Sequence, residues 1–251
     1  MKVTVCELED GWFEEETVWN RLIEHVGDEN SDLVLLPEMP FSRWLARTKD
    51  VEPEQWRLAV TSHDLWIDRL SELPASVVVG ARPVIEGQNR YNEGFIWEQR
   101  TGYKAVHRKF YLPNEKGFWE ASWYQRGGGD FKVVDISGIK IGFLICTELW
   151  FNAHARDYCK QGIHLLMCPR VTPLASIDRW ITGGRTAAIV SGAFCLSSNL
   201  NGPNVEGIDF GGTGWIIEPE EGDVLGLTDS ASPFLSIELD LAEAEKAKRT
   251  Y

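Results

Sequence analysis

Three apolar segments of this chain each end in a residue that can take part in chemistry. Glu38 follows the run LVLLP, Cys146 follows IGFLI, and Arg170 follows HLLMCP. A cysteine thiol supplies a soft nucleophile, and a carboxylate can exchange protons with it. In sheets with parallel strands, ligand sites lie outside the carboxyl ends of the strands. We therefore expect the three side chains to share one cleft with Lys109, which directly follows the predicted strand 102–107.

Cys146 is the candidate nucleophile among five cysteines. A helix is predicted shortly after it, over 151–161, and a thiolate close to a helix N-terminus can have a lowered pKa because of the helix dipole. The cysteines include no Cys-x-x-Cys pair, so neither a disulfide framework nor a zinc knuckle is predicted. We expect reduced thiols, with those inside apolar runs acting as small buried hydrophobic residues.

The composition indicates a folded protein with a single domain, residues 1–251. Of its 251 residues, 43% are hydrophobic and 11 are tryptophan, which is enough for one large α/β core. The 38 acidic and 25 basic residues give a net charge of −13, which repels nucleic acid and anionic lipid. The N-terminal segment lacks the apolar region of a signal peptide, and no stretch has the length of a membrane span. We therefore expect a soluble, cytoplasmic protein.

Hydrophobic periodicity predicts strands alternating with helices. The expected helices cover 12–26, 53–73, 151–161, 177–190 and 240–249. The expected strands cover 2–8, 33–36, 76–84, 91–98, 102–107, 131–136, 140–145, 164–168, 193–198, 215–217, 224–225 and 234–239, with glycine-rich turns over 202–214. The segment 109–130 has no period but many aromatic residues, which favours a functional loop.

Five short motifs follow one another along most of the chain. They are LLPE at 35–38, RKFYLP at 108–113, GFLICTE at 142–148, FGGTG at 210–214 and PEEGDVL at 219–225. Each motif alone is weak, but together, in this order and spacing, they resemble the nitrilase superfamily of carbon-nitrogen hydrolases. The resemblance implies an α/β fold of the four-layer αββα sandwich type, in which two sheets pack face to face between helices. It also implies a homodimer or higher homo-oligomer.

The resemblance implies a catalytic set of Glu, Lys and Cys, often with a second Glu. By motif position, Glu38 is the general base, Lys109 the electrostatic stabiliser and Cys146 the nucleophile. The second glutamate lies in the loop after the lysine, where Glu120 in GFWE matches better than Glu115, which stays as the alternative. No metal or organic cofactor is implied, and the histidines show no metal-ligand spacing.

The pocket around Cys146 must also stabilise charge and hold the substrate. An amide is a poor electrophile, so its hydrolysis needs a group that stabilises the negative charge on the carbonyl oxygen. Lys109 and the backbone N–H of Thr147 are expected to do so. Trp150 and Arg170 are expected to line the pocket, where Arg170 could bind a carboxylate in a bidentate way. The alternatives are packing for Trp150 and, for Arg170, an ion pair at the surface or one that supports the pocket from behind its lining.

These residues predict a cysteine-dependent amidase that releases ammonia from a small linear amide through a thioester. An N-carbamoyl amide hydrolase or a nitrilase would use the same residues, although Leu149 and Trp150 stand where carbamoyl-hydrolysing members often have arginine. A Cys–His protease using His154 fits less well. The alternative from another class is a catalytically silent member that binds a metabolite or a protein partner.

Overall fold

The computed structural model describes residues 1–203 and 207–250. Its α-helices are α1 (Glu16–Glu29), α2 (Pro53–Arg69), α3 (Glu120–Trp123), α4 (Asn152–Gln161), α5 (Ile177–Ser191) and α6 (Leu241–Ala247). Its short 3-10 helices are η1 (Trp12–Glu14), η2 (Leu70–Glu72), η3 (Cys146–Trp150) and η4 (Leu174–Ser176).

The strands follow the predicted order. They are β1 (Lys2–Glu9), β2 (Leu33–Glu38), β3 (Val77–Glu86), β4 (Asn89–Glu98), β5 (Gly102–Arg108), β6 (Val134–Ile136), β7 (Ile139–Phe143), β8 (Leu165–Arg170), β9 (Phe194–Pro203), β10 (Asp209–Gly211), β11 (Trp215–Ile217), β12 (Val224–Leu227) and β13 (Phe234–Glu238).

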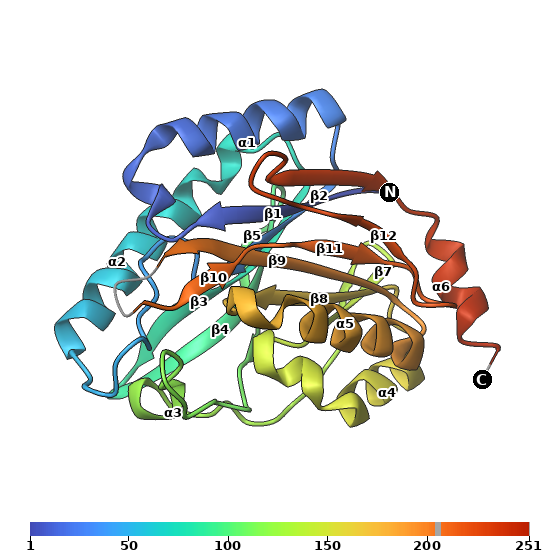
Figure 1. The fold of residues 1–251 in the computed structure, drawn as a ribbon. Coiled ribbons are helices and arrows are strands. Elements are labelled where there is room, and N and C mark those ends of the chain that lie inside the picture. The colour runs from blue at the N-terminus through green and yellow to red at the C-terminus, as the bar shows by residue number, and fades with distance from the viewer. Residues whose placement is uncertain (204–206, 251) are drawn as a thin grey trace.

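The strands form one hydrogen-bonded path that folds into two facing sheets. The path runs β5-β4-β3-β2-β1-β9-β8-β7-β6, with β13 paired to β1 and both β10 and β11 paired to β9. Strands β1, β2 and β3 are parallel, and so are β7, β8 and β9. The two halves join where Glu7 on β1 pairs with Asn199 on β9. Figure 1 shows both halves and the helices around them.

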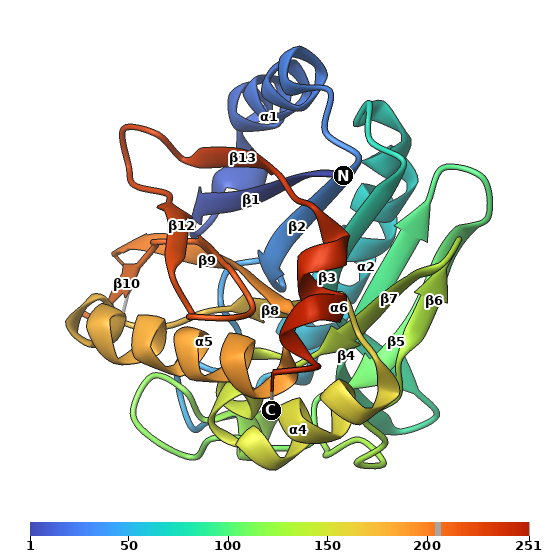
Figure 2. The ribbon, with the colours of Figure 1, turned by 90° about the vertical axis from the view of Figure 1, so that its right-hand side faces the viewer.

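Three buried hydrophobic clusters define four layers. Between the two sheets, Leu33 and Leu35 of β2 belong to the same cluster as Phe143 of β7 and Met167 of β8. The alternate residues of β2 face outward and pack with tryptophans of α1 and α2. A third cluster joins the outer face of β8 and β9 to α4 and α5. The layers are therefore helix, sheet, sheet and helix, as predicted, and Figure 2 shows them from the side.

Parallel strands buried on both faces bring their carboxyl ends to one region of the molecule. All six residues of β2 and all six of β8 are buried. Pro37 cannot donate a ladder hydrogen bond, and the pairing of β2 with β3 is irregular between Leu35 and Glu38. Directly after Glu38 the chain turns at Met39, whose φ is 49°. The end of β2 therefore places Glu38 at the border between the sheets and the loops that follow the strands.

The structure differs from the sequence prediction at a few boundaries. Strand β7 ends at Phe143 rather than 145, and the aromatic loop contains the short helix α3. The turns predicted over 202–214 include 204–206, which lie outside the described residues, while 209–211 form β10. Gly162 caps α4 with a φ of 77°, as predicted. Within the described ranges, no helix is both long and apolar enough to cross a bilayer.

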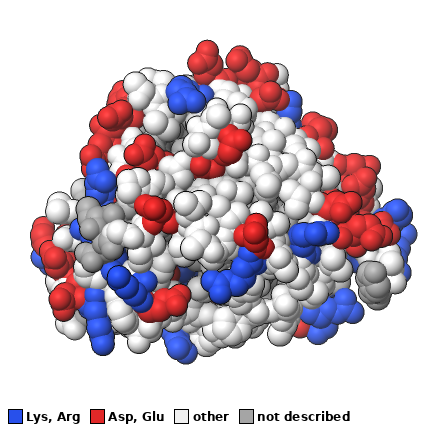
Figure 3. All heavy atoms as spheres, in the orientation of Figure 1, with Lys and Arg blue, Asp and Glu red and all other residues white. Residues whose placement is uncertain are grey.

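Acidic side chains dominate parts of the surface. On the face drawn in Figure 3, Asp and Glu gather over α1 and around α6, whereas Lys and Arg lie mostly below them. This distribution follows from the net charge of −13.

Candidate active site

Lys109 lies between two glutamates in a fully buried cluster. Its Nζ donates to Glu38 Oε1 at 2.8 Å and to Glu120 Oε1 at 2.9 Å, and Glu120 Oε2 lies 2.7 Å away. All three side chains have an exposed fraction of 0%. An ammonium has three N–H donors, so one remains for a third acceptor. The structure thus brings together the predicted Glu38, Lys109 and Glu120.

Asn92 and Tyr124 hold the two glutamates in place, and the sequence analysis missed both. Asn92 Nδ2 donates to Glu38 Oε1 at 2.6 Å, and the Tyr124 hydroxyl donates to Glu120 Oε2. Glu38 Oε2 is buried and has no hydrogen-bond partner among the described residues. That oxygen is therefore free to accept a proton. Tyr124 follows Glu120 by four residues, one helical turn, which is a signal that could have identified it.

Cys146 occupies a strained turn directly above this cluster. Its φ of 49° lies in the left-handed region, which costs an L-residue about 1–2 kcal/mol. Strain of this kind persists where surrounding contacts enforce it, often at functional sites. Here Leu144 N bonds Met167 O at 2.9 Å, and the Cys146 thiol points toward Val171 O, with Sγ at 3.6 Å. The backbone therefore directs the buried thiol toward the residue that follows β8, at the edge of the hydrophobic cluster to which Cys146 belongs.

The expected lowering of the Cys146 pKa by a helix dipole is not what the structure supports. The residues after Cys146 form the short 3-10 helix η3, and α4 begins only at Asn152. Burial, followed by the negative charge of Glu38, raises the pKa of Cys146 well above its usual value, although Lys109 acts in the opposite direction. The buried surroundings of Cys146 therefore favour the thiol over the thiolate.

Burial and mutual electrostatic interaction set the pKa values of Lys109 and Glu120. Burial lowers the pKa of Lys109, but Glu120 and Glu38 together raise it above its ordinary value, so the ammonium stays charged. Burial raises the pKa of Glu120 to about 7, against the lowering effect of Lys109. The site therefore holds a permanent cation next to a carboxyl group that titrates near neutrality.

Glu148 connects the Cys146 turn to the Lys109 segment. Its Oε2 accepts from Ile145 N at 2.8 Å and lies 2.8 Å from His107 Nε2, while Oε1 accepts from Phe110 N at 2.7 Å. The side chain is fully buried. Glu148 belongs to the motif at 142–148, but the sequence analysis assigned it no role. Its charge, two residues after Cys146 in a mainly apolar segment, was the available signal.

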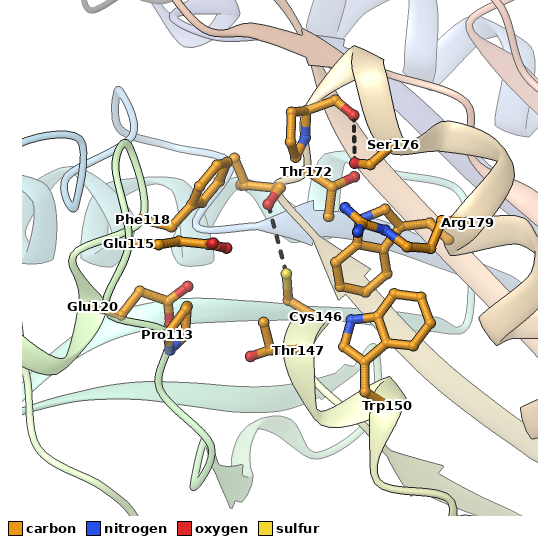
Figure 4. A pocket seen from close by; sticks show the side chains of 13 residues that line it. Pro113, Glu115, Phe118, Glu120, Cys146, Thr147, Trp150, Thr172, Ser176 and Arg179 are labelled. Atoms are coloured by element: carbon orange, nitrogen blue, oxygen red, sulfur yellow. Dashed lines mark hydrogen bonds between the residues drawn. The ribbon is translucent and has the colours of Figure 1, made fainter.

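A cavity of about 360 Å³ opens over Cys146. The predicted Thr147 and Trp150 both line it, and so does Glu120. Thr147 Oγ1 donates to Tyr111 O at 2.8 Å, and its backbone N–H has no acceptor in the described part of the chain. Figure 4 shows the thiol at the centre of the cavity wall, with Thr147 and Trp150 beside it. The Thr147 amide is therefore available for the predicted oxyanion contact.

Arg170 does not line this cavity. Its guanidinium donates to Ser197 Oγ, Thr172 Oγ1 and Thr213 O at 2.6 to 2.7 Å, and lies 4.0 Å from the centre of the Trp215 ring. The residue is 1% exposed. Each of its three guanidinium nitrogens already has an acceptor, so the geometry supports a structural role behind the pocket wall. The expectation that Arg170 lines the pocket and could bind a substrate carboxylate is therefore wrong.

Glu115 and His154 also lie apart from the buried cluster. Glu115 is exposed on the cavity rim, and Glu120 occupies the position next to Lys109. His154 Nε2 lies 2.9 Å from the Tyr111 hydroxyl, and its ring stacks on Phe131. Within residues 1–203 and 207–250, no group of three or more His, Cys, Asp and Glu could hold a metal ion.

The family model described as carbon-nitrogen hydrolase matches residues 2–249. The chain belongs to the carbon-nitrogen hydrolase family. It is therefore a hydrolase that acts on carbon–nitrogen bonds, with the fold of the nitrilase superfamily. A carbon-nitrogen hydrolase from Helicobacter pylori G27 has the same fold, with a TM-score of 0.89 and 20% identity, covering 100% of this chain and 93% of that one.

Two relatives in this family have names that state an activity. The 2-oxoglutaramate amidase of Bacillus subtilis (strain 168) is 23% identical over 223 residues, which cover 88% of this chain and 83% of the relative. The N-carbamoylputrescine amidase of Arabidopsis thaliana is 29% identical over 162 residues, covering 58% of this chain and 53% of the relative. Both relatives are named as amidases.

We expect the kcat/KM of the hydrolase to rise as the pH increases through about 7. Burial raises the pKa of Glu120 to about 7, and only its ionised form stabilises the charge of Lys109. Glu120→Gln should lower the rate and remove this inflection. The pH profiles of both proteins, measured from pH 5 to 9, test the assignment. An identical inflection in Glu120→Gln would assign it to another group.

Glu148→Gln should lower kcat by about tenfold and the free energy of unfolding by about 1–3 kcal/mol. The glutamine side chain accepts hydrogen bonds through its oxygen but not through its NH₂ group. One of the two backbone N–H donors, at Ile145 or Phe110, therefore loses its acceptor. Initial rates and denaturant unfolding measure the two effects. Glu221→Gln, at an exposed position in a turn, is the matched control. A normal kcat in Glu148→Gln would show that the connection is dispensable.

Proposed function

We propose that this hydrolase is a cysteine-dependent amidase that releases ammonia from a small linear amide through a thioester. The observation that carries the proposal is the buried cluster of Glu38, Lys109 and Glu120 beneath the Cys146 thiol, at the base of a small cavity. This arrangement provides a nucleophile, a proton acceptor and a fixed cation in one buried site.

The first half of the reaction is acylation of the thiol. Glu38 accepts the thiol proton on its free Oε2, and the sulfur attacks the amide carbon to form a C–S bond. Lys109 Nζ and the Thr147 N–H stabilise the negative charge on the carbonyl oxygen. Glu38 then returns the proton to the amide nitrogen as the C–N bond breaks, so ammonia leaves and a thioester remains.

The second half is hydrolysis of the thioester. Glu38 takes a proton from a water molecule, and the resulting hydroxide adds to the thioester carbon. Lys109 Nζ and the Thr147 N–H also stabilise the second tetrahedral intermediate. The C–S bond then breaks, the proton on Glu38 returns to the sulfur, and the carboxylic acid product leaves. Glu120 keeps Lys109 charged and in position throughout this cycle.

A substrate panel tests this proposal. A primary amide, an N-carbamoyl compound and a nitrile of similar size are supplied to the protein, and ammonia and carbon dioxide are measured. Ammonia from the amide alone supports the amidase. Carbon dioxide released together with ammonia would identify an N-carbamoyl hydrolase, and turnover of the nitrile would identify a nitrilase. No turnover of any compound by the wild-type protein would contradict the enzymatic proposal.

The competing function is that of a catalytically silent binding protein. It predicts that Cys146 reacts with a small alkylating agent no faster than Cys159, the partly exposed free cysteine on α4. The proposed amidase predicts preferential labelling of Cys146, because Glu38 can accept its proton during the attack. Mass spectrometry of the labelled protein separates the two. The homodimer, the single domain and the cytoplasmic location stay predictions.

A further inference from the structure

We propose that Gly183 on α5 determines the largest acyl group that the cavity accepts. Because this residue has no side chain, the Trp150 ring can lie against the helix and leave the space over Cys146 open. The inference rests on the proposed amidase function and deepens it, since it assigns the size limit of the acyl group to a residue outside the cavity lining.

Two consecutive glycines, Gly183 and Gly184, stand in the interior of α5, a helix of 15 residues. Glycine destabilises a helix interior relative to alanine, so a packing requirement is the expected reason for the pair. A Cβ atom at Gly184 would lie 2.9 Å from the ring of Trp215, a core residue. A Cβ atom at Gly183 would lie 2.8 Å from Cζ3 and 3.1 Å from Cη2 of Trp150. Gly184 therefore makes room for the core, and Gly183 makes room for a residue of the cavity.

The Trp150 ring lies between α5 and the cavity. The outer edge of the ring meets the helix at Gly183, and the same side chain lines the cavity over Cys146. Figure 4 shows Trp150 on one side of the thiol, with Pro113 and Glu120 on the other side. A substrate whose carbonyl carbon reaches the thiol must therefore place its acyl chain beside the Trp150 ring.

A methyl group on Gly183 would displace this ring rather than the helix. Carbon atoms in contact lie about 3.5–4.0 Å apart, so the ring would have to shift by about 1 Å. The helix is held in place, because Gly184 packs on the fully buried ring of Trp215. Trp150 is 40% exposed, and Trp180 limits its sideways movement, with ring centres 4.7 Å apart. The displaced ring therefore moves away from α5 and toward the cavity.

The cavity has little spare room for such a shift. Its volume of about 360 Å³ lies at the small end of the range for ligand sites, about 300–1,000 Å³. A misfit of one methylene group in an apolar pocket changes kcat/KM by about 10- to 200-fold. A shift of the ring by about 1 Å should therefore exclude long acyl groups and still admit short ones.

Turnover of two linear amides, propanamide and hexanamide, tests the proposal. Gly183→Ala should lower kcat/KM by about tenfold for hexanamide and by less than about twofold for propanamide, because only the long acyl chain reaches the displaced ring. Gly27→Ala on α1 is the matched control, since a Cβ atom there would make an ordinary contact, 3.5 Å from Pro74. Equal losses for the two amides in Gly183→Ala, or no loss for either, would overturn the proposal.

A double-mutant cycle with Trp150→Leu shows whether the effect passes through the ring. In Trp150→Leu no ring meets the new methyl group, so adding Gly183→Ala should change the ratio of the two kcat/KM values by less than about twofold. A change of about tenfold in this background as well would mean that the substitution acts through α5 itself, and it would contradict the role of Gly183.

Chemical labelling of Cys146 separates a failure of this inference from a failure of the proposed activity, because it needs no turnover. Mass spectrometry measures the rates with N-methylmaleimide, a small reagent, and N-benzylmaleimide, a large one. In Gly183→Ala the N-benzylmaleimide rate should fall by about tenfold and the N-methylmaleimide rate by less than about twofold. That result supports the size limit even if the wild-type protein hydrolyses no amide. Rates equal to those of the wild-type protein for both reagents would contradict the size limit even if the protein is an active amidase.

Discussion

Cys146→Ala should reduce ammonia release by at least about 10⁴-fold while the protein remains folded. The thiol is the group placed to form a covalent bond at the base of the cavity, and nothing else among the lining residues can replace it as a soft nucleophile. Steady-state assays give the rate, and circular dichroism confirms the fold. Cys159→Ala, at a partly exposed cysteine, is the matched control and should keep full activity. Residual turnover above about one per cent would exclude the thioester route.

The same position offers a test of backbone strain. With φ at 49°, alanine at 146 keeps the left-handed strain, whereas glycine relieves it. Glycine ordinarily costs about 0.5–1 kcal/mol relative to alanine. We therefore expect Cys146→Gly to be at least as stable as Cys146→Ala in denaturant unfolding, with both inactive. A less stable glycine variant would mean that the turn holds no strain of this size.

Lys109→Met should abolish turnover and lower the free energy of unfolding by about 3–5 kcal/mol at pH 8. Removing the ammonium leaves the carboxyl groups of Glu38 and Glu120 buried together without their cation. The methionine chain has a similar length, so the effect comes from charge rather than from a cavity. Denaturant unfolding measures the stability, and Lys160→Met, at an exposed surface position, is the control.

The stability loss of Lys109→Met should depend on pH in a defined direction. Burial already raises the pKa of Glu120 to about 7, and without Lys109, which lowers it, the pKa rises further. A carboxyl group whose folded pKa is raised stabilises the fold below its unfolded pKa, and this contribution is lost as the pH rises through the folded value. The variant should therefore approach wild-type stability near pH 5 and lose most at pH 8. A pH-independent loss would argue for a packing defect.

A second change should separate stability from activity at this cluster. Adding Glu120→Gln to Lys109→Met removes one of the two uncompensated carboxyl groups. We expect this double variant to regain part of the stability lost at pH 8, because a neutral amide is less costly to bury than a carboxylate. It should remain inactive, since the cation that stabilises the oxyanion is still missing.

Local sequence patterns predicted the order of strands and helices. The apolar runs at β2 and β8 and the helical spacing of α5 are properties of neighbouring residues, so they are visible without the fold. The ends of predicted strands singled out Glu38, Lys109 and Cys146, and the family resemblance added their expected roles. The boundaries were less certain, because β7 ends two residues early where the Cys146 turn begins.

The sequence by itself predicted the α/β class, and with the family resemblance it predicted the layers, the candidate nucleophile and its two charged neighbours in motif order. Only the tertiary structure decided which glutamate contacts Lys109, since Glu115 and Glu120 share one loop and α3 alone carries Glu120 into the core. It also reversed the expected shift of the Cys146 pKa and placed Arg170 behind the cavity wall. Burial and side-chain direction depend on contacts between residues far apart in the chain, and a local pattern does not contain them.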